Sequence, residues 1–209
     1  MKISDKKIKW LFFDLGSTLV DETECVKKRC DVIIENNDID KDEFYAKVNE
    51  CAKIDSYAVK AAAQYYGAEI PRWFGELEIL YPGTVTILDK LSKKYKLGII
   101  ANQVAGTQKR IDNWGIGKYF DVVVASAEIG YAKPDFEIFN IALEQAGCEP
   151  SESVMIGDRL DNDIVPAKKL GMKTVWVRQG FAKMQCVKSK AENPDYIIET
   201  IGDILDVFS

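Results

Sequence analysis

Histidine is absent from this chain of 209 residues. Without an imidazole base, Ser-His-Asp and Cys-His mechanisms are excluded. The five cysteines are odd in number and scattered along the chain, so we expect reduced thiols rather than a disulfide framework. Cys25 and Cys30 lack zinc-finger spacing, and no histidine can complete a ligand set, so the sequence does not predict a zinc site.

Long apolar runs and long basic stretches are also lacking. No segment approaches the length of a membrane span, and residues 1–6 do not form the apolar stretch of a signal peptide. The net charge of −5 argues against non-specific binding to nucleic acid. We therefore expect a cytoplasmic protein with neither a membrane nor a nucleic acid as its partner.

The most informative feature that is present is an apolar run over residues 10–13 that ends on a single carboxylate, Asp14, and then breaks into Gly16, Ser17 and Thr18. An ionised side chain at the tip of a strand must be stabilised by hydrogen bonds or by a cation. Asp14 is therefore a candidate reactive group, although an aspartate that only caps a turn would give the same pattern.

Three later segments repeat this arrangement of an apolar run with a polar end. Asp158 follows the run 153–157, Asn102 follows the run 97–101, and Lys133 lies after the run 122–124. In an open parallel sheet, ligands bind beyond the carboxyl ends of the strands, so these groups could share one crevice. Carboxylates suit a hard cation such as Mg²⁺, and a lysine neutralises an anionic substrate. The alternatives are a helix-capping role for Asp158 and a surface position for Lys133.

After Gly83 the sequence alternates helix-like and strand-like segments in units short enough for βαβ crossovers, which predicts a parallel sheet covered by helices on both faces. The expected strands lie near residues 9–14, 97–101, 121–125, 153–157 and 173–177, with a shorter one near 195–198. Pro134 suits the first position of the helix that follows, in which Phe136, Phe139 and Leu143 share a face.

The segment 21–80 lacks strand-like runs and has helical spacing, as in Phe44, Val48, Cys51 and Ala52. We therefore expect a small helical domain over 21–80, inserted into an α/β core formed by 1–20 and 81–209. With 47% hydrophobic residues, a chain of this length can bury a core and a small accessory domain.

The order and spacing of these segments resemble the haloacid dehalogenase-like (HAD) hydrolases, which are mostly Mg²⁺-dependent phosphatases. Asp14 matches the nucleophile of that family, Lys133 matches its phosphate-neutralising lysine, and the stretch from Asp158 to Asp163 matches its acidic metal motif. The segment 81–85 is similar to the one that returns the family's chain from cap to core. The resemblance implies a Rossmann-like α/β core with a helical cap.

Two positions depart from the family pattern. The phosphatases of the family read Asp-x-Asp-x-Thr at the first motif; Thr18 matches its threonine, but Gly16 stands where the second aspartate, the general acid and base, is expected. The loss of such a group lowers the rate by roughly 10²–10⁴-fold. Ala101 replaces the serine or threonine that usually holds the phosphate, although Asn102 and backbone N–H groups could still contact it.

The resemblance implies a phosphatase that acts on a small phosphorylated metabolite through an aspartyl-phosphate intermediate, weakened by Gly16. The implied catalytic residues are Asp14 and Lys133; the implied phosphate-binding residues are Ala101, Asn102 and Lys133; the implied Mg²⁺ ligands are Asp14, the Gly16 carbonyl and Asp158, with Thr18 and Asp163 in support.

Other functions remain open at this point. Gly16 and Ala101 would also suit a catalytically impaired member that binds phosphate compounds or a protein partner. A dehalogenase would not need the metal motif at Asp158, and a phosphonate hydrolase would need a cap lysine such as Lys53, so neither has direct support.

Another residue could replace the general acid that is missing at position 16, or a substitution could restore it. Asp21, Glu22 and Glu24 follow the first motif closely and could take over its role, although acids are common at the start of a helix. If only the acid is missing, Gly16→Asp is expected to raise turnover by about 10²-fold.

Overall fold

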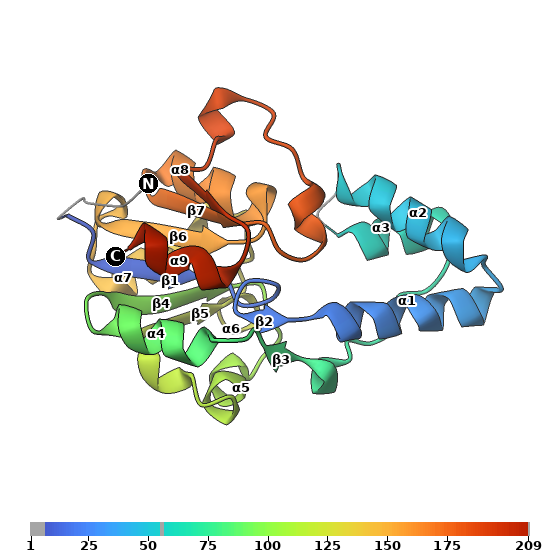
Figure 1. The fold of residues 1–209 in the computed structure, drawn as a ribbon, viewed down its shortest axis with the longest axis horizontal. Helices are drawn as coiled ribbons and strands as arrows, with labels where there is room; N and C mark the ends of the chain where they lie inside the picture. Colours follow the sequence, from blue (N-terminus) through green and yellow to red (C-terminus); the bar gives the residue numbers. More distant parts are fainter. Residues whose placement is uncertain (1–6, 55–56, 209) are drawn as a thin grey trace.

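The computed structural model describes residues 7–54 and 57–208. They form a parallel sheet of six strands in the order β5-β4-β1-β6-β7-β8, with helices packed on it (Figure 1). All five neighbouring pairs in this sheet are parallel, as the sequence predicts. The strands are β1 (Trp10–Phe13), β4 (Lys96–Ala101), β5 (Val122–Ala125), β6 (Ser153–Gly157), β7 (Lys173–Val177) and β8 (Tyr196–Ile198).

β1 lies inside the sheet, between β4 and β6, and all four of its residues are buried. Phe13, its last residue, pairs with Ile99 on one side and with Ile156 on the other. The backbone N–H of Asp14 donates to the carbonyl of Ile156 at 2.8 Å, so the chain leaves β1 beside the end of β6. This register brings the carboxyl ends of β1 and β6 together.

Helices cover both faces of the sheet because successive side chains of a strand point to opposite faces. Leu11 and Phe13 belong to one apolar core, together with residues of α4 and α9. Trp10 and Phe12 belong to the other core, together with residues of α7 and α8. The helices of this part are α4 (Thr84–Ser92), α5 (Thr107–Asn113), α6 (Ser126–Ile129), α7 (Phe136–Ala146), α8 (Val165–Leu170) and α9 (Ile204–Val207).

Three helices form a separate group that projects away from the sheet, on the right of Figure 1. They are α1 (Thr23–Asn37), α2 (Lys41–Ala52) and α3 (Ala58–Tyr65), and we call them the helical lobe. The lobe has an apolar core of its own, in which Ile33, Phe44 and Val48 are buried. Among the described residues, no helix is long and apolar enough to cross a membrane.

The chain enters and leaves the helical lobe through two short antiparallel strands, β2 (Val20–Asp21) and β3 (Ile79–Leu80). The sequence does not predict this pair, because two residues are too few to show the alternation of a strand. Pro134 is also misplaced by the sequence prediction. It precedes α7, which begins at Phe136, and the N-cap is Asp135, whose carboxylate accepts the N–H of Glu137 at 2.9 Å.

The expected face of α7 is confirmed in part. Phe139 and Leu143 are buried against the sheet, whereas Phe136 is 43% exposed because it lies in the first turn of the helix.

Candidate active site

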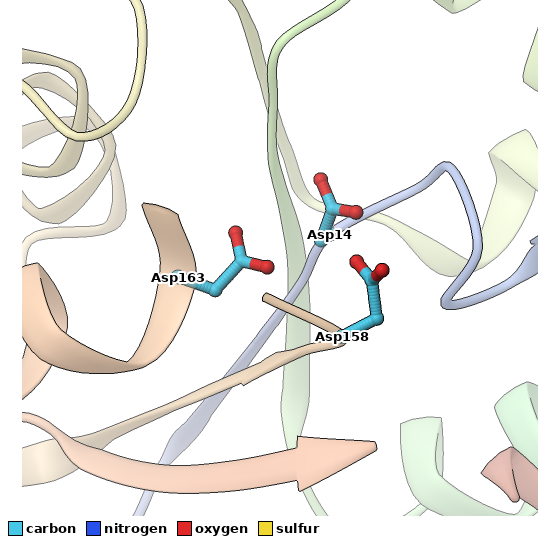
Figure 2. A group of neighbouring side chains, drawn as sticks. All are labelled: Asp14, Asp158 and Asp163. Atoms are coloured by element: carbon cyan, nitrogen blue, oxygen red, sulfur yellow. The ribbon is translucent and has the colours of Figure 1, made fainter. Parts of the chain in front are cut away.

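Three aspartates meet beyond the carboxyl ends of the central strands (Figure 2). Asp14 follows β1, Asp158 follows β6, and Asp163 lies in the π-helical turn η4 (Leu160–Ile164). All three are buried, and one carboxylate oxygen from each lies within 4.8 Å of the others. The structure thus brings together the three acidic side chains that the sequence analysis singles out.

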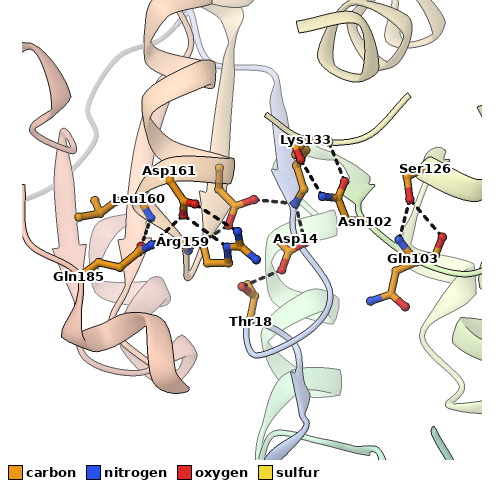
Figure 3. Close-up of polar contacts among 11 residues, drawn as sticks. Asp14, Thr18, Asn102, Gln103, Ser126, Lys133, Arg159, Leu160, Asp161 and Gln185 are labelled. Carbon is orange, nitrogen blue, oxygen red and sulfur yellow. Dashed lines mark hydrogen bonds and ion pairs between the residues drawn. The ribbon is translucent and has the colours of Figure 1, made fainter. Parts of the chain in front are cut away.

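Lys133 lies between two of these aspartates. Its Nζ donates to Oδ1 of Asp14 at 2.6 Å (Figure 3). The same Nζ donates to Oδ1 of Asp163 at 2.6 Å, and the lysine side chain is 2% exposed. Burial lowers the pKa of Lys133, but the attraction of Asp14 and Asp163 outweighs it and raises the pKa above its usual value. Lys133 is therefore a buried cation and not a surface lysine.

Asn102 fixes the backbone of Lys133 rather than its side chain. The Asn102 side chain accepts the N–H of Lys133 at 2.7 Å and donates to the Lys133 carbonyl at 2.8 Å (Figure 3). These two bonds join the end of β4 to the segment before α7. Ala101 precedes Asn102 as the buried last residue of β4, where its methyl group offers no hydrogen bond.

The loop after Asp14 folds back on itself. The N–H groups of Leu19 and Val20 donate to the carbonyl of Leu15 at 3.0 and 2.9 Å, and the hydroxyl of Thr18 donates to Oδ2 of Asp14 at 3.5 Å. The positive φ of this loop falls on Ser17, at 56°.

Gln179 holds this loop from outside, and the sequence analysis missed it. Its Nε2 donates to the carbonyl of Ser17 at 3.1 Å, and its Oε1 accepts the N–H of Ile201 at 2.6 Å. A polar residue directly after an apolar strand was the signal used for Asp14 and Asp158, whereas Gln179 lies one residue further on, after Arg178, and so lacks that signal.

Negative charge exceeds positive charge among the buried groups. Three aspartates and one lysine leave two formal negative charges when all are ionised. Burial, with repulsion from Asp14 and Asp163, raises the pKa of Asp158 well above its usual value. Burial and the charge of Asp14 also raise the pKa of Asp163, to about 6, against the opposing effect of Lys133. A divalent cation would relieve this repulsion.

Asp163 approaches the end of β6 so closely that only glycine fits at position 157. A Cβ on Gly157 would lie 2.5 Å from Cγ of Asp163. The same carboxylate accepts the N–H of Arg159 at 3.0 Å, which fixes its second oxygen while the first binds Lys133. This pairing suits Asp163 to orienting Lys133.

These groups line a cavity of about 380 Å³ between the sheet and the helical lobe. The lobe contributes Arg29 and Lys60, and the described segments next to it contribute Tyr57 and Trp73. Arg159 reaches across from the core, with its guanidinium carbon 4.4 Å from the centre of the Tyr57 ring. The sequence analysis did not assign the cationic side chains of Arg29, Lys60 and Arg159, because residues this far apart in the sequence meet only through the packing of the lobe beside the core.

Glu22 also lines this cavity. It is part-buried, and its Oε2 accepts a hydrogen bond from the Ser17 hydroxyl at 3.3 Å. Burial, together with the charges of Asp14 and Glu78, raises the pKa of Glu22 to about 8.

Comparison with known proteins shows the family of this chain. The family model for haloacid dehalogenase-like hydrolases matches residues 11–177. The chain therefore belongs to this family, and it is a hydrolase of the α/β type that the resemblance implied.

Two relatives of similar length are named phosphatases. The pyrophosphatase PpaX of Bacillus velezensis is 28% identical over 98% of this chain and 98% of its own. The glyceraldehyde 3-phosphate phosphatase of Pyrococcus furiosus is 31% identical over 97% of this chain and 93% of its own. Both matches extend across the core and the helical lobe.

Solved structures show the same fold. A HAD phosphatase from Thermococcus onnurineus is 27% identical, with a TM-score of 0.66 over 95% of this chain and 97% of that one. The HAD-hydrolase YfnB of Bacillus subtilis is 21% identical, with a TM-score of 0.70 over 96% of this chain and 98% of that one, and it supports the fold alone.

Proposed function

We propose that this protein is a Mg²⁺-dependent phosphatase that acts on a small phosphorylated metabolite through an aspartyl-phosphate intermediate. The observation that carries the proposal is the position of Asp14, whose carboxylate lines the cavity while a buried lysine and a second strand-end aspartate lie beside it. A carboxylate held in this way suits covalent catalysis of phosphoryl transfer.

The residues present fit a magnesium ion. Asp14, the Gly16 carbonyl and Asp158 would hold it, because all three offer the oxygen ligands that Mg²⁺ prefers. The two surplus negative charges of the buried group match a divalent cation. When bound, Mg²⁺ neutralises part of the charge that develops on the transferred phosphoryl group.

Lys133 would neutralise part of the negative charge of the phosphate. Its ammonium group has three donor hydrogens, and two of them point to Asp14 and Asp163, so one remains for a phosphate oxygen. In this proposal Asn102 acts by holding the Lys133 backbone, and Thr18 acts by orienting Asp14. Ala101 supplies only space and its backbone N–H.

We infer that the helical lobe is a cap, with domain boundaries at 21–80 for the cap and at 1–20 and 81–209 for the core. The support is that the lobe and the segments next to it supply one wall of the cavity, and a closed wall excludes water from the reaction. Lys53, the residue on which a phosphonate hydrolase would depend, lines a separate cavity with Leu160 and Gln185.

The names of the relatives suggest which substrates to test first. Pyrophosphate and glyceraldehyde 3-phosphate are small, and a cavity of about 380 Å³ is of the size that binds small ligands.

The direct test is a phosphate-release screen across phosphorylated metabolites, with Mg²⁺ and with a chelator. We expect release that requires Mg²⁺, falls to background in Asp14→Asn, and persists in Asp89→Asn, a control in which an aspartate exposed on α4 is changed. Turnover that survives Asp14→Asn would refute the assigned nucleophile, and turnover that survives the chelator would refute the metal dependence.

A second function, phosphate binding without turnover, is favoured by one observation. The end of β4 carries the methyl group of Ala101 where a hydroxyl would have helped to hold a phosphate in the reaction. Vanadate that binds beside Lys133 in a protein that releases no phosphate from any compound would support this function instead.

A further inference from the structure

One carboxyl group in the cavity has no part in the proposed binding of metal or phosphate. Glu22 is the residue before α1, but its side chain does not cap that helix. The cap contact comes from Asp21, whose carboxylate accepts the N–H of Thr23 at 2.9 Å. The Glu22 side chain is thus free to turn into the cavity, which it lines together with Asp14.

The carboxyl group of Glu22 occupies the space beside Gly16. A Cβ placed on Gly16 would lie 2.8 Å from Cδ and from Oε2 of Glu22, which is closer than real Cβ atoms come to other atoms. The absence of a side chain at position 16 therefore makes room for this carboxyl group, only two residues beyond Asp14. The Ser17 hydroxyl, which donates to Oε2 at 3.3 Å, holds it there.

The other carboxylates of the cavity are already engaged. Asp14 and Asp163 each accept a hydrogen bond from Lys133 at 2.6 Å. Asp158 lies within 4.8 Å of both aspartates, at the expected metal site. Glu22 is the remaining carboxyl group among the described residues that line this cavity.

We propose that Glu22 is the general acid and base of the reaction. Its side chain extends from the residue before α1 into the space that Gly16 leaves open. This inference rests on the proposed phosphatase function. It adds a catalytic residue that the first motif of the sequence does not contain.

Glu22 alone accounts for the proton transfers in both half-reactions. In the first, a carboxylate oxygen of Asp14 attacks the phosphorus, the bond from phosphorus to the leaving oxygen breaks, and that oxygen takes the proton of the Glu22 carboxyl group. In the second, water attacks the phosphorus of phospho-Asp14 and gives its proton to the Glu22 carboxylate. The bond from phosphorus to Asp14 breaks, phosphate is released, and both side chains return to their starting states.

The two neighbouring acids are less suited to this role. Asp21 uses its carboxylate to cap α1, and the side chain of Glu24 is 66% exposed and lies 3.9 Å from Lys27. The placement of Glu22 also changes the expectation for Gly16→Asp. The new side chain would displace the Glu22 carboxyl group, so the single substitution should not raise turnover.

The test compares leaving groups. A general acid matters most for a poor leaving group, so Glu22→Gln should lower kcat/KM for an alkyl phosphate by about 10²-fold. The loss for nitrophenyl phosphate, whose leaving oxygen needs little protonation, should be several times smaller. Glu24→Gln is the matched control, and it should leave kcat/KM for both substrates unchanged.

A rescue experiment gives a second measurement that does not depend on one variant. Glu22→Ala empties the space beside Gly16, and the double variant Glu22→Ala/Gly16→Asp returns a carboxyl group to it from the other side. We expect the double variant to hydrolyse the alkyl phosphate at least about 10-fold faster than Glu22→Ala, which is less than the roughly 10²-fold of a well-positioned acid because the new carboxyl group comes from a different backbone position.

The outcomes separate this inference from the proposed function. Equal losses for both leaving groups, or no loss, in a wild-type protein that is active and depends on Asp14 would overturn the role of Glu22 alone. Failure of the double variant to exceed Glu22→Ala would do the same. No turnover in the wild-type protein would overturn the proposed function and this inference with it.

Discussion

Replacing Lys133 by methionine should destabilise the metal-free protein by about 3 kcal/mol. The substitution keeps most of the side-chain volume but removes the cation that binds two buried carboxylates, each at 2.6 Å. Breaking a buried ion pair by removing one partner costs about 3–5 kcal/mol. We expect the lower end because the side chain of Asp14 is 11% exposed and water can reach it. Domains of ordinary stability unfold at a cost of about 5–15 kcal/mol, so the variant should still fold.

The measurement is urea unfolding at neutral pH in the presence of a chelator. Lys93→Met is the control, because the side chain of Lys93 is 68% exposed in its pair with Asp89 and such pairs contribute about 0–1 kcal/mol. The loss for Lys133→Met should shrink at mildly acid pH. Without the lysine the pKa of Asp163 rises above its present value of about 6, so protonation of this carboxyl group relieves the repulsion as the pH falls.

A second arm tests the cause of the destabilisation. In Lys133→Met/Asp163→Asn one of the stranded carboxylates is gone, and the double variant should be more stable than Lys133→Met alone. A loss below about 1 kcal/mol for Lys133→Met, the range of exposed pairs, would refute the reasoning, because Lys133 would then not be compensating buried charge.

Three further predictions concern the site. Gly157→Ala should lower stability by about 1–3 kcal/mol in urea unfolding, because its Cβ would lie 2.5 Å from Cγ of Asp163; an unchanged midpoint would contradict this close approach. Asn102→Ala should weaken vanadate binding by about 10-fold in a calorimetric titration, since two bonds that place Lys133 are lost; equal affinity would show that the lysine is placed without them. Folding raises the pKa of Asp163 from its usual value of 3.8 to about 6. Between these two pH values the folded, metal-free protein binds more protons than the unfolded chain, so its stability falls as the pH rises through this range. Mg²⁺ competes with those protons, so the rise in melting temperature that it causes should grow with pH, and a pH-independent rise would contradict the assignment of Asp158 and Asp163 to one charged cluster.

The sequence predicts the parallel sheet and the polar residues at its carboxyl-end edge well, because local sequence patterns indicate both. Asp14 and Asp158 each follow an apolar run, and the ends of parallel strands must meet at one edge, so their proximity follows without knowledge of the helices. Lys133 carries a weaker signal. Its place after the apolar run 122–124 makes it a candidate, but its burial depends on two acids that lie 119 and 30 residues away, and no local pattern encodes those contacts.

The parts that the sequence does not predict depend on packing between distant segments. Glu22 is one of three acids within the four residues 21–24, and only the direction in which α1 leaves β2 decides which of them enters the cavity. β2 and β3 are too short to show a period, and Pro134 is displaced from α7 because Asp135 is the better N-cap.

The side chain of Gln179 has a consequence for where the functional unit ends. The family match stops at residue 177, which suggests that the segment after β7 is dispensable. However, Gln179 joins the carbonyl of Ser17 to the N–H of Ile201, and so ties the loop after Asp14 to the last turns of the chain. A fragment cut at the boundary of the family match would leave that loop without its outer support, and the segment beyond β7 is therefore part of the scaffold of the proposed active site.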